Sequence, residues 1–319
     1  MRVVIVGSGA VGSLFAAHLG QLEDVKTWVY DTDQAHVDAI NEHGLRLSGV
    51  GDIHSRVAAT ADPASLPSCD FAIVGTKSMH TSEAIQAVAH ALAAGGAALS
   101  VQNGIGNEET LAEHVPRVIR GTTFPAGRVI APGHVAWDVA GDTWIGPFEP
   151  SPAELEEVER LAETLTRAGM PTKALPDARG AQWTKLIFNA ATNPIGALTG
   201  LSHGRVCEFE PTRRVVSGLI VEGVQVADAL GVQLDSDPEE LVDHAADVAY
   251  EHKASMLQDI EARRQTEIEY LNEGIVRFGR DTGVPTPLNQ AVAALVKGLE
   301  SSWEPARDPH PAGESAQEA

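Results

Sequence analysis

The pattern of apolar and polar positions divides the chain into two halves. In the first half, short apolar runs at 3–6, 71–74, 97–101 and 118–121 predict buried parallel strands. Segments with helical spacing at 34–42, 82–94 and 108–114 lie between them. This alternation is typical of a doubly wound parallel sheet with helices on both faces. We therefore expect an α/β domain of the Rossmann type over residues 1–176.

Shorter runs in the same half predict additional strands. Residues 45–47 and 53–57 resemble a small hairpin, and the runs 127–130, 134–139 and 143–145 alternate between Gly- and Pro-containing turns. We expect the last three to be antiparallel strands that extend the main sheet. A polar amphipathic helix over 153–168 and a short strand over 171–175 complete the half.

The second half contains helical patterns alone. Segments 178–198, 213–230, 238–256, 261–282 and 288–299 predict helices, which together form an all-α domain over residues 177–302. The apolar stretch 219–226 suits either the domain core or a contact with a second subunit. Residues 303–319 are rich in Pro, Glu, Ser, Gly and Ala, and we expect them to form a disordered tail.

A glycine motif follows the first apolar run. Gly7-Ser8-Gly9-Ala10-Val11-Gly12 lies between the predicted strand and a segment of helical spacing, which is the context of a dinucleotide-binding turn. Such a turn approaches a pyrophosphate closely, and the free N–H groups of the helix bind the anion. The alternative is a glycine-rich turn in an unrelated α/β protein, but the strand–turn–helix order favours the nucleotide.

An acidic residue follows a further predicted strand over residues 25–30. Asp31 lies about 20 residues beyond Gly12, where a carboxylate accepts a hydrogen bond from a ribose 2′-hydroxyl and repels a 2′-phosphate. The pattern therefore predicts NAD(H) as the cofactor. Alternatively, Asp31 or Asp33 merely caps the next helix, which Asp commonly does. In a third arrangement, one of the two caps the helix while the other binds the ribose.

Composition narrows the classes of partner. The formal net charge of −21 argues against a nucleic-acid partner, which requires a basic face. Cys69 and Cys207 lie far apart without a CxxC motif, so we expect neither a disulfide framework nor a metal site, and we expect a reducing cytoplasm. No apolar stretch is long enough to span a membrane.

Three polar residues recur in the helix predicted over 178–198. Lys185, Asn189 and Asn193 are spaced by four residues, so they share one helix face. A stripe of one Lys and two Asn differs from an ordinary solvated face, where Glu and Lys dominate. It indicates either the lining of a site or a buried polar network between helices.

Four motifs together resemble the ketopantoate reductase (2-dehydropantoate 2-reductase) family. They are the glycine turn, Gln102-Asn103-Gly104-Ile105-Gly106, the stripe of Lys185, Asn189 and Asn193 followed by Pro194, and a segment that runs from Ser255 through Asp259, Arg264 and Thr266 to Glu267 and Ile268. The resemblance extends over nearly the whole chain. It implies a Rossmann domain followed by a helical domain like the C-terminal domain of 6-phosphogluconate dehydrogenase. It also implies reduction of 2-dehydropantoate to (R)-pantoate in pantothenate and coenzyme A synthesis.

The resemblance also implies roles for individual residues. Lys185 matches the catalytic lysine, and Glu267, which we expect at the start of a helix, matches the glutamate that supports the lysine and substrate. Asn103, Asn189, Asn193 and Ser255 match substrate contacts, while Lys77 and Asn103 match positions near the cofactor. A 2-oxo acid gains hydride from a nicotinamide and a proton from the Lys185 ammonium, without a metal.

Two departures from the family pattern bear on the cofactor and substrate. Family members place an Arg near the end of the second strand, which implies NADP(H), whereas Asp31 favours NAD(H) here. His252-Lys253-Ala254 precedes Ser255 where an Asn-x-Ser pattern is common. We favour NAD(H), with a small 2-oxo acid as substrate and a homodimer as a possible assembly. The alternatives are a paralogous reductase of another 2-oxo acid and a nucleotide-binding redox sensor without catalysis.

Overall fold

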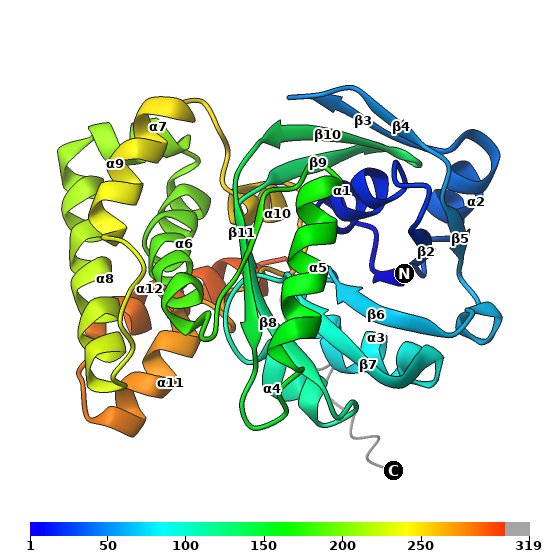
Figure 1. Cartoon of the computed structure of the whole chain (residues 1–319). Coiled ribbons are helices and arrows are strands. Elements are labelled where there is room, and N and C mark those ends of the chain that lie inside the picture. The colour runs from blue at the N-terminus through cyan, green and yellow to red at the C-terminus, as the bar shows by residue number, and fades with distance from the viewer. Residues whose placement is uncertain (304–319) are drawn as a thin grey trace, which may run out of the picture.

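The protein, described over residues 1–303 by a computed structural model, consists of a sheet domain followed by a helical domain (Figure 1). The helical domain begins with α6 (Arg179–Thr199), after the last strand of the sheet domain. The expected tail lies, apart from Trp303, outside the described residues. Within residues 1–303, no helix combines the length and the hydropathy needed to cross a membrane.

The main sheet has eight strands in the order β12-β11-β8-β7-β6-β1-β2-β5. The six strands from β8 to β5 are parallel, β11 is antiparallel to β8, and β12 is parallel to β11. This confirms the predicted parallel-dominated α/β fold. The strands are β1 (Arg2–Val6), β2 (Lys26–Tyr30), β5 (Ala58–Thr60), β6 (Cys69–Val74), β7 (Leu92–Ser100), β8 (Val118–Thr123), β11 (Thr143–Pro147) and β12 (Thr172–Ala174).

Helices cover both faces of this sheet. They are α1 (Ala10–Leu19), α2 (Gln34–His43), α3 (Thr81–Val88), α4 (Asn107–Ala112) and α5 (Leu155–Arg167), with short 3₁₀ turns at Pro63–Ser65, Ser78–His80 and Ala89–Ala91. Alternate residues of β1 serve different cores: Val3 and Ile5 pack with α1 and α5, whereas Val4 and Val6 pack with α3 and α4. All four side chains are fully buried, as expected of a central parallel strand.

A second sheet corrects one expectation. The strands β9 (Ala126–Ala131) and β10 (His134–Val139) are antiparallel to each other, but they join β3 (Leu45–Gly49) and β4 (Ile53–Ser55) in the order β4-β3-β10-β9 rather than the main sheet. Only the third predicted run, β11, extends the main sheet. The physical reason is α1, whose residues from Gly12 to Leu19 are all buried and which packs against β3, β4, β9 and β10.

Two helices end earlier than the sequence pattern predicts. The helix expected over 82–94 ends at Val88, and Gly95 and Gly96 lie inside β7. The helix expected over 238–256 divides at Val248, because the carbonyls of Tyr250 and His252 accept hydrogen bonds from the first N–H groups of α7. The pattern did not predict α7 itself.

The helical domain is built around α6. Its helices are α6 (Arg179–Thr199), α7 (His203–Glu208), α8 (Glu210–Ala229), α9 (Pro238–Val248), α10 (Ser255–Glu261), α11 (Asn272–Thr282) and α12 (Pro287–Ser301). Helix α6 packs against α8, α9, α10 and α12. In the apolar stretch 219–226, Leu219, Ile220 and Val226 are buried in this core, and Val221 is exposed.

Candidate active site

The glycine turn after β1 leaves open space where a ligand can approach. Gly7 has φ +83°, and a Cβ there would lie 2.4 Å from the Thr76 side chain. A Cβ on Gly12 would lie 1.9 Å from the Gly7 carbonyl oxygen, so this glycine lets α1 begin directly against the turn. Gly9 has no atom within 4 Å of an ideal Cβ position. The turn is therefore closely packed on one side and open over Gly9.

The two aspartates after β2 have separate roles. Asp33 caps α2, because its side chain accepts hydrogen bonds from the N–H groups of Ala35 and His36. Asp31 instead faces the glycine turn: its Oδ2 accepts from the Ser8 N–H at 2.6 Å, and its Oδ1 accepts from the Asp33 N–H at 2.9 Å. Both Asp31 and Gly9 line one cleft.

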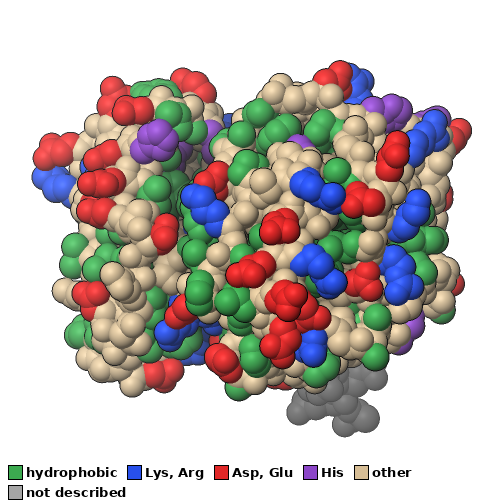
Figure 2. All heavy atoms as spheres, viewed as in Figure 1, with side chains coloured by type: hydrophobic (Ala, Val, Ile, Leu, Met, Phe, Trp, Pro, Cys, Tyr) green, Lys and Arg blue, Asp and Glu red, His purple; other side chains and the backbone are tan. Residues whose placement is uncertain are grey.

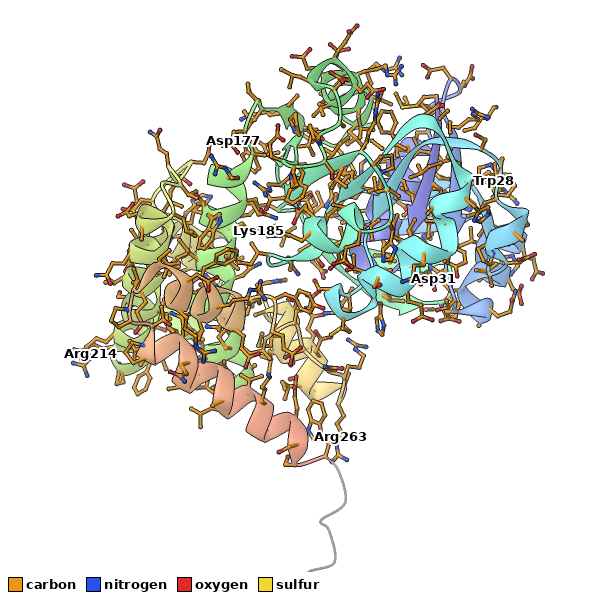
Figure 3. All side chains as sticks on the ribbon, turned by 90° about the horizontal axis from the view of Figure 1, so that it is seen from below. Trp28, Asp31, Asp177, Lys185, Arg214 and Arg263 are labelled. Carbon is orange, nitrogen blue, oxygen red and sulfur yellow. The ribbon has the colours of Figure 1, made fainter. Side chains whose placement is uncertain are left out.

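Lys185 projects from α6 toward the sheet domain (Figure 3). Its ammonium donates hydrogen bonds to Asn103 Oδ1 at 2.9 Å and to the Thr123 carbonyl at 2.5 Å. Burial disfavours the charged form and lowers the pKa of Lys185 to about 8, although the Glu267 carboxylate acts in the opposite direction. The group is thus a stronger acid than an ordinary lysine and still protonated at neutral pH.

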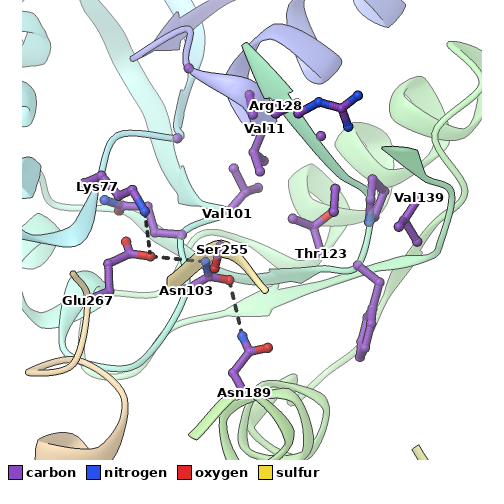
Figure 4. Close-up of a pocket in the computed structure, with 18 of the residues that line it drawn as sticks. Val11, Lys77, Val101, Asn103, Thr123, Arg128, Val139, Asn189, Ser255 and Glu267 are labelled. Carbon is purple, nitrogen blue, oxygen red and sulfur yellow. Dashed lines mark hydrogen bonds and ion pairs between the residues drawn. The ribbon is translucent and has the colours of Figure 1, made fainter. Parts of the chain in front are cut away.

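Glu267 connects the two domains. It is buried, and its Oε1 accepts from the Ser78 backbone N–H at 3.0 Å while its Oε2 accepts from Asn103 Nδ2 at 3.2 Å. In Figure 4 the interactions run from Lys77 through Glu267 and Asn103 to Asn189. The carboxylate therefore orients the amide whose other end holds Lys185.

The structure corrects the local fold around Glu267. We expected this residue at the start of a helix over 261–282, but α10 ends at Glu261 and α11 begins only at Asn272. Arg263 adopts φ 51°, and the Arg264 N–H bonds to the Asp259 carbonyl, which closes the helix end. The Thr266 N–H then bonds to Glu300 on α12. The Thr266–Glu300 bond anchors the segment to α12, and Glu267 reaches the sheet domain from the turns that lie between α10 and α11.

Lys77, which follows β6 in the sheet domain, contacts α10. Its Nζ is 2.5 Å from Asp259 Oδ2 and 3.7 Å from Glu267 Oε2. Burial by itself lowers the pKa of Lys77, but the two carboxylates outweigh it and raise the pKa. Asp259 also binds Arg264 and is almost fully buried. We gave Asp259 and Ser78 no role from the sequence, although Asp259 lies in the motif that ends with Glu267.

The remaining candidates line the same cleft. The polar stripe of α6 faces it through Lys185, Asn189 and Asn193, and Ser255 lies at the first turn of α10. Asn189 Nδ2 is 3.4 Å from Asn103 Oδ1, so the second residue of the stripe belongs to the network around Lys185. Every residue singled out for a cofactor or substrate lines the cleft, except Ser8 and Gly12, which lie in the buried part of the turn.

The cleft has a volume of about 1410 Å³ and lies between the two domains. It extends from the open side of the glycine turn, past Lys185, to the ends of α7 and α9. Figure 2 shows acidic side chains spread over both parts of the visible surface. By contrast, Lys77 and Lys185, the two cations that interact with Glu267, line the cleft.

These features fit a dinucleotide. The open space over Gly9 adjoins the N-terminus of α1, where a pyrophosphate is favoured. Asp31 follows β2 at the sequence spacing typical of a residue that contacts the ribose. Lys77, Val101 and Gln102 continue the lining toward Lys185. The fold and the site therefore define an oxidoreductase that uses a nicotinamide cofactor and has a lysine ammonium beside the cofactor cleft.

Comparisons with known proteins identify the family. The family model described as "Ketopantoate reductase PanE/ApbA" matches residues 3–150, and its C-terminal counterpart matches residues 177–300. The 2-dehydropantoate 2-reductase of Pyrococcus abyssi is 34% identical over 303 residues, which is 94% of this chain and 98% of that protein. The chain therefore belongs to the ketopantoate reductase family, which confirms the resemblance seen in the sequence.

Solved structures agree with this placement. The PanE/ApbA family ketopantoate reductase from Ralstonia eutropha superposes with a TM-score of 0.85 at 32% identity, covering 95% of this chain and 99% of that one. A D-mandelate dehydrogenase, whose structure contains NADH and anilino(oxo)acetate, superposes with a TM-score of 0.86 at 25% identity over 95% of this chain and 99% of that one.

Proposed function

We propose that this protein reduces 2-dehydropantoate to (R)-pantoate, with a reduced nicotinamide as hydride donor, in pantothenate synthesis. The observation that carries the proposal is the Lys185 ammonium, held by Asn103 and Thr123 at the centre of the cleft in a chain of this family. Relatives named 2-dehydropantoate 2-reductase match over nearly the full chain.

The residues of the chain supply the proton and the orientation. Reduction of a 2-oxo acid requires a hydride on the carbonyl carbon, which a bound nicotinamide supplies, and a proton on the carbonyl oxygen. The Lys185 ammonium donates that proton and stabilises the developing alkoxide. Its lowered pKa makes the transfer easier, while the Glu267 carboxylate keeps it protonated at neutral pH.

Neutral polar groups bind the rest of the substrate. The amides of Asn189 and Asn193 and the hydroxyl of Ser255 line the cleft beside Lys185, where they suit a carboxylate and a hydroxyl group. Glu267 acts on this arrangement through Asn103, whose amide it orients. In this proposal, Lys77 pairs with the buried carboxylates of Asp259 and Glu267 at the cofactor side of the cleft.

For the cofactor, we propose NAD(H). The Asp31 carboxylate is held by the Ser8 and Asp33 N–H groups at the cleft wall, and Thr32 beside it carries no charge. A 2′-phosphate would meet an anion there, whereas a 2′-hydroxyl would donate to it. We further propose a cytoplasmic enzyme, in keeping with two free cysteines, and a homodimer, for which the exposed Val221 and Leu295 are candidate contacts.

One steady-state assay tests the function and the cofactor together. We expect NADH oxidation that depends on 2-dehydropantoate, with a KM for NADH at least tenfold below that for NADPH. Lys185→Ala should lower kcat at least a hundredfold and leave NADH affinity within about threefold, because the change removes the proton donor alone. Lys26→Ala, at an exposed position of β2, is the matched control.

Other outcomes identify the alternatives. Turnover with a different 2-oxo acid alone would indicate a paralogous reductase. Tight nucleotide binding without any turnover would indicate a redox sensor. A clear preference for NADPH would overturn the role of Asp31 and leave the role of Lys185 intact.

A further inference from the structure

Ser78 is a buried residue at the contact between the two domains, and the proposed mechanism does not use its side chain. It begins the 3₁₀ turn Ser78–His80 that follows β6, and it is only 1% exposed. Its backbone N–H and its hydroxyl lie 3.0 and 3.1 Å from the same oxygen, Oε1 of Glu267. Ser78 therefore fixes a carboxylate of the helical domain to the sheet domain.

The Ser78 hydroxyl has two acceptors within reach and one proton to donate. Its Oγ lies 3.1 Å from Glu267 Oε1 and 3.0 Å from the backbone carbonyl oxygen of Asn103. That carbonyl already accepts a hydrogen bond from Asn107 Nδ2 at 3.0 Å. A carboxylate is also a stronger acceptor than a neutral carbonyl. The proton of the hydroxyl therefore belongs to the bond with Glu267.

The position of Glu267 in turn sets the direction of the Asn103 amide. With Oε1 held by Ser78, Glu267 Oε2 accepts from Asn103 Nδ2 at 3.2 Å, and Figure 4 shows this bond. An amide that donates through Nδ2 toward one side presents its oxygen toward the other. The Asn103 Oδ1 accepts from the Lys185 ammonium at 2.9 Å. Each bond of this series thus fixes the next one.

Resting on the proposed role of Lys185, we infer that Ser78 is a positioning residue for the proton donor and acts through Glu267 and Asn103. Without its hydroxyl, Oε1 keeps the Ser78 N–H alone, and the carboxylate is freer to turn toward Lys77, whose Nζ lies 3.7 Å from Oε2. That movement releases the Asn103 amide. The Lys185 ammonium then spends less time aimed at the substrate carbonyl, which lowers the rate of proton transfer.

Removal of the hydroxyl leaves no acceptor without a donor. In Ser78→Ala, Glu267 Oε1 still accepts from the backbone N–H of residue 78, and the Asn103 carbonyl still accepts from Asn107. The variant therefore avoids the cost of an unsatisfied buried oxygen, and we expect it to fold and to bind NADH.

Steady-state kinetics with NADH and 2-dehydropantoate test the inference. In Ser78→Ala we expect kcat to fall about fivefold to tenfold, because a hydrogen bond to a charged group is lost. The KM values for both substrates should stay within about twofold, because Ser78 acts on the proton donor and not on binding. Ser82→Ala, the same change in α3, is the control and should keep kcat, since the Ser82 hydroxyl bonds to His114 instead. A kcat within about twofold of the original in Ser78→Ala, or a loss confined to KM, would overturn the inference.

A double-mutant cycle tests whether Ser78 acts through the carboxylate. In the Glu267→Ala background, Ser78→Ala should change kcat by less than about twofold, because the group that the hydroxyl holds is gone. The same fivefold or larger loss in both backgrounds would mean that Ser78 only supports the turn, and the inference would be wrong while the proposed function stands. An intact protein that reduces no 2-oxo acid would overturn the proposed function, and this inference with it.

Discussion

At the scale of single residues, the site depends on a lysine whose pKa is lowered by burial and raised by a nearby carboxylate. Burial lowers the pKa of Lys185 to about 8, and Glu267 opposes that shift across the Asn103 amide. The spacing of the α6 stripe predicted that Lys185, Asn189 and Asn193 share a face, and they do line one cleft. The sequence alone could not tell whether that face met a site or another helix, because both alternatives bury polar groups.

The pH dependence of turnover follows from this balance. Because the ammonium must donate a proton, we expect kcat for reduction to fall as pH rises through about 8. In Glu267→Gln the carboxylate that raises the pKa is lost, so the fall should move to lower pH and kcat should drop about tenfold or more.

A pH–rate profile of each protein at saturating substrate checks this expectation. Glu163→Gln, on the exposed side of α5, is the control and should keep the original profile. An unchanged profile in Glu267→Gln would show that Glu267 does not set the acidity of the proton donor.

At the scale of elements, the strand–turn–helix unit at the N-terminus separates packing from binding. Gly12 touches the Gly7 carbonyl closely, whereas Gly9 faces open space in the cleft. The motif predicted this unit well, because the turn, the strand and the helix are all local features. It did not distinguish the roles of the glycines, which depend on what surrounds each one.

Two alanine variants should therefore behave differently. Gly12→Ala places a Cβ 1.9 Å from a backbone oxygen and should lower the free energy of unfolding by about 2–4 kcal/mol. Gly9→Ala meets no protein atom, so its Tm should stay within about 2 °C of the original, while its Kd for NADH rises at least tenfold.

Differential scanning calorimetry and an NADH titration measure these two effects. A normal Kd for NADH in Gly9→Ala would mean that the space over Gly9 is not where the cofactor binds.

The predictions about strands and helix ends that proved wrong share a cause. Strands β9 and β10 form where expected, but they belong to the second sheet, which packs against α1. Helix α9 ends at Val248, where the N-terminal N–H groups of α7 bind the carbonyls that follow. In each case a tertiary contact overrides a local pattern. The contacts of Phe124 with Trp144 and Phe188 were likewise not visible in the sequence, because these three residues lie far apart along the chain.

At the scale of the whole molecule, a buried carboxyl group joins the domains away from the cleft. Glu108 on α4 is almost fully buried, and its Oε1 accepts a hydrogen bond from Gln182 Nε2 at 2.7 Å. Gln182 lies on α6, one turn before Lys185. Burial raises the pKa of Glu108 to about 7, although Arg120 acts in the opposite direction. The protonated form is thus favoured in the folded protein.

Because of this raised pKa, the stability contributed by Glu108 at the contact between the domains depends on pH. The stability that protonated Glu108 contributes is fully present below its unfolded pKa of 4.5 and is lost as pH rises through about 7. Glu108→Gln stays neutral, so its free energy of unfolding relative to the original should rise between pH 5 and pH 8 by up to about 3 kcal/mol.

Thermal unfolding of both proteins at several pH values tests this. Glu109→Gln, next to it but exposed, is the control. A difference between Glu108→Gln and the original that stays constant with pH would contradict the proposed titration.

The sequence by itself determined the features that depend on neighbours along the chain. These are the parallel strands, the glycine turn, the placement of Asp31 after a strand, and the shared face of Lys185, Asn189 and Asn193, because strand burial and helix periodicity are local. Tertiary structure alone decided the second sheet, the turns that carry Glu267 to the sheet domain, the acidity of Lys185, and the contacts of Phe124 with Trp144 and Phe188. Each of these depends on contacts or on loss of water between segments that are distant in sequence, and no local pattern records them.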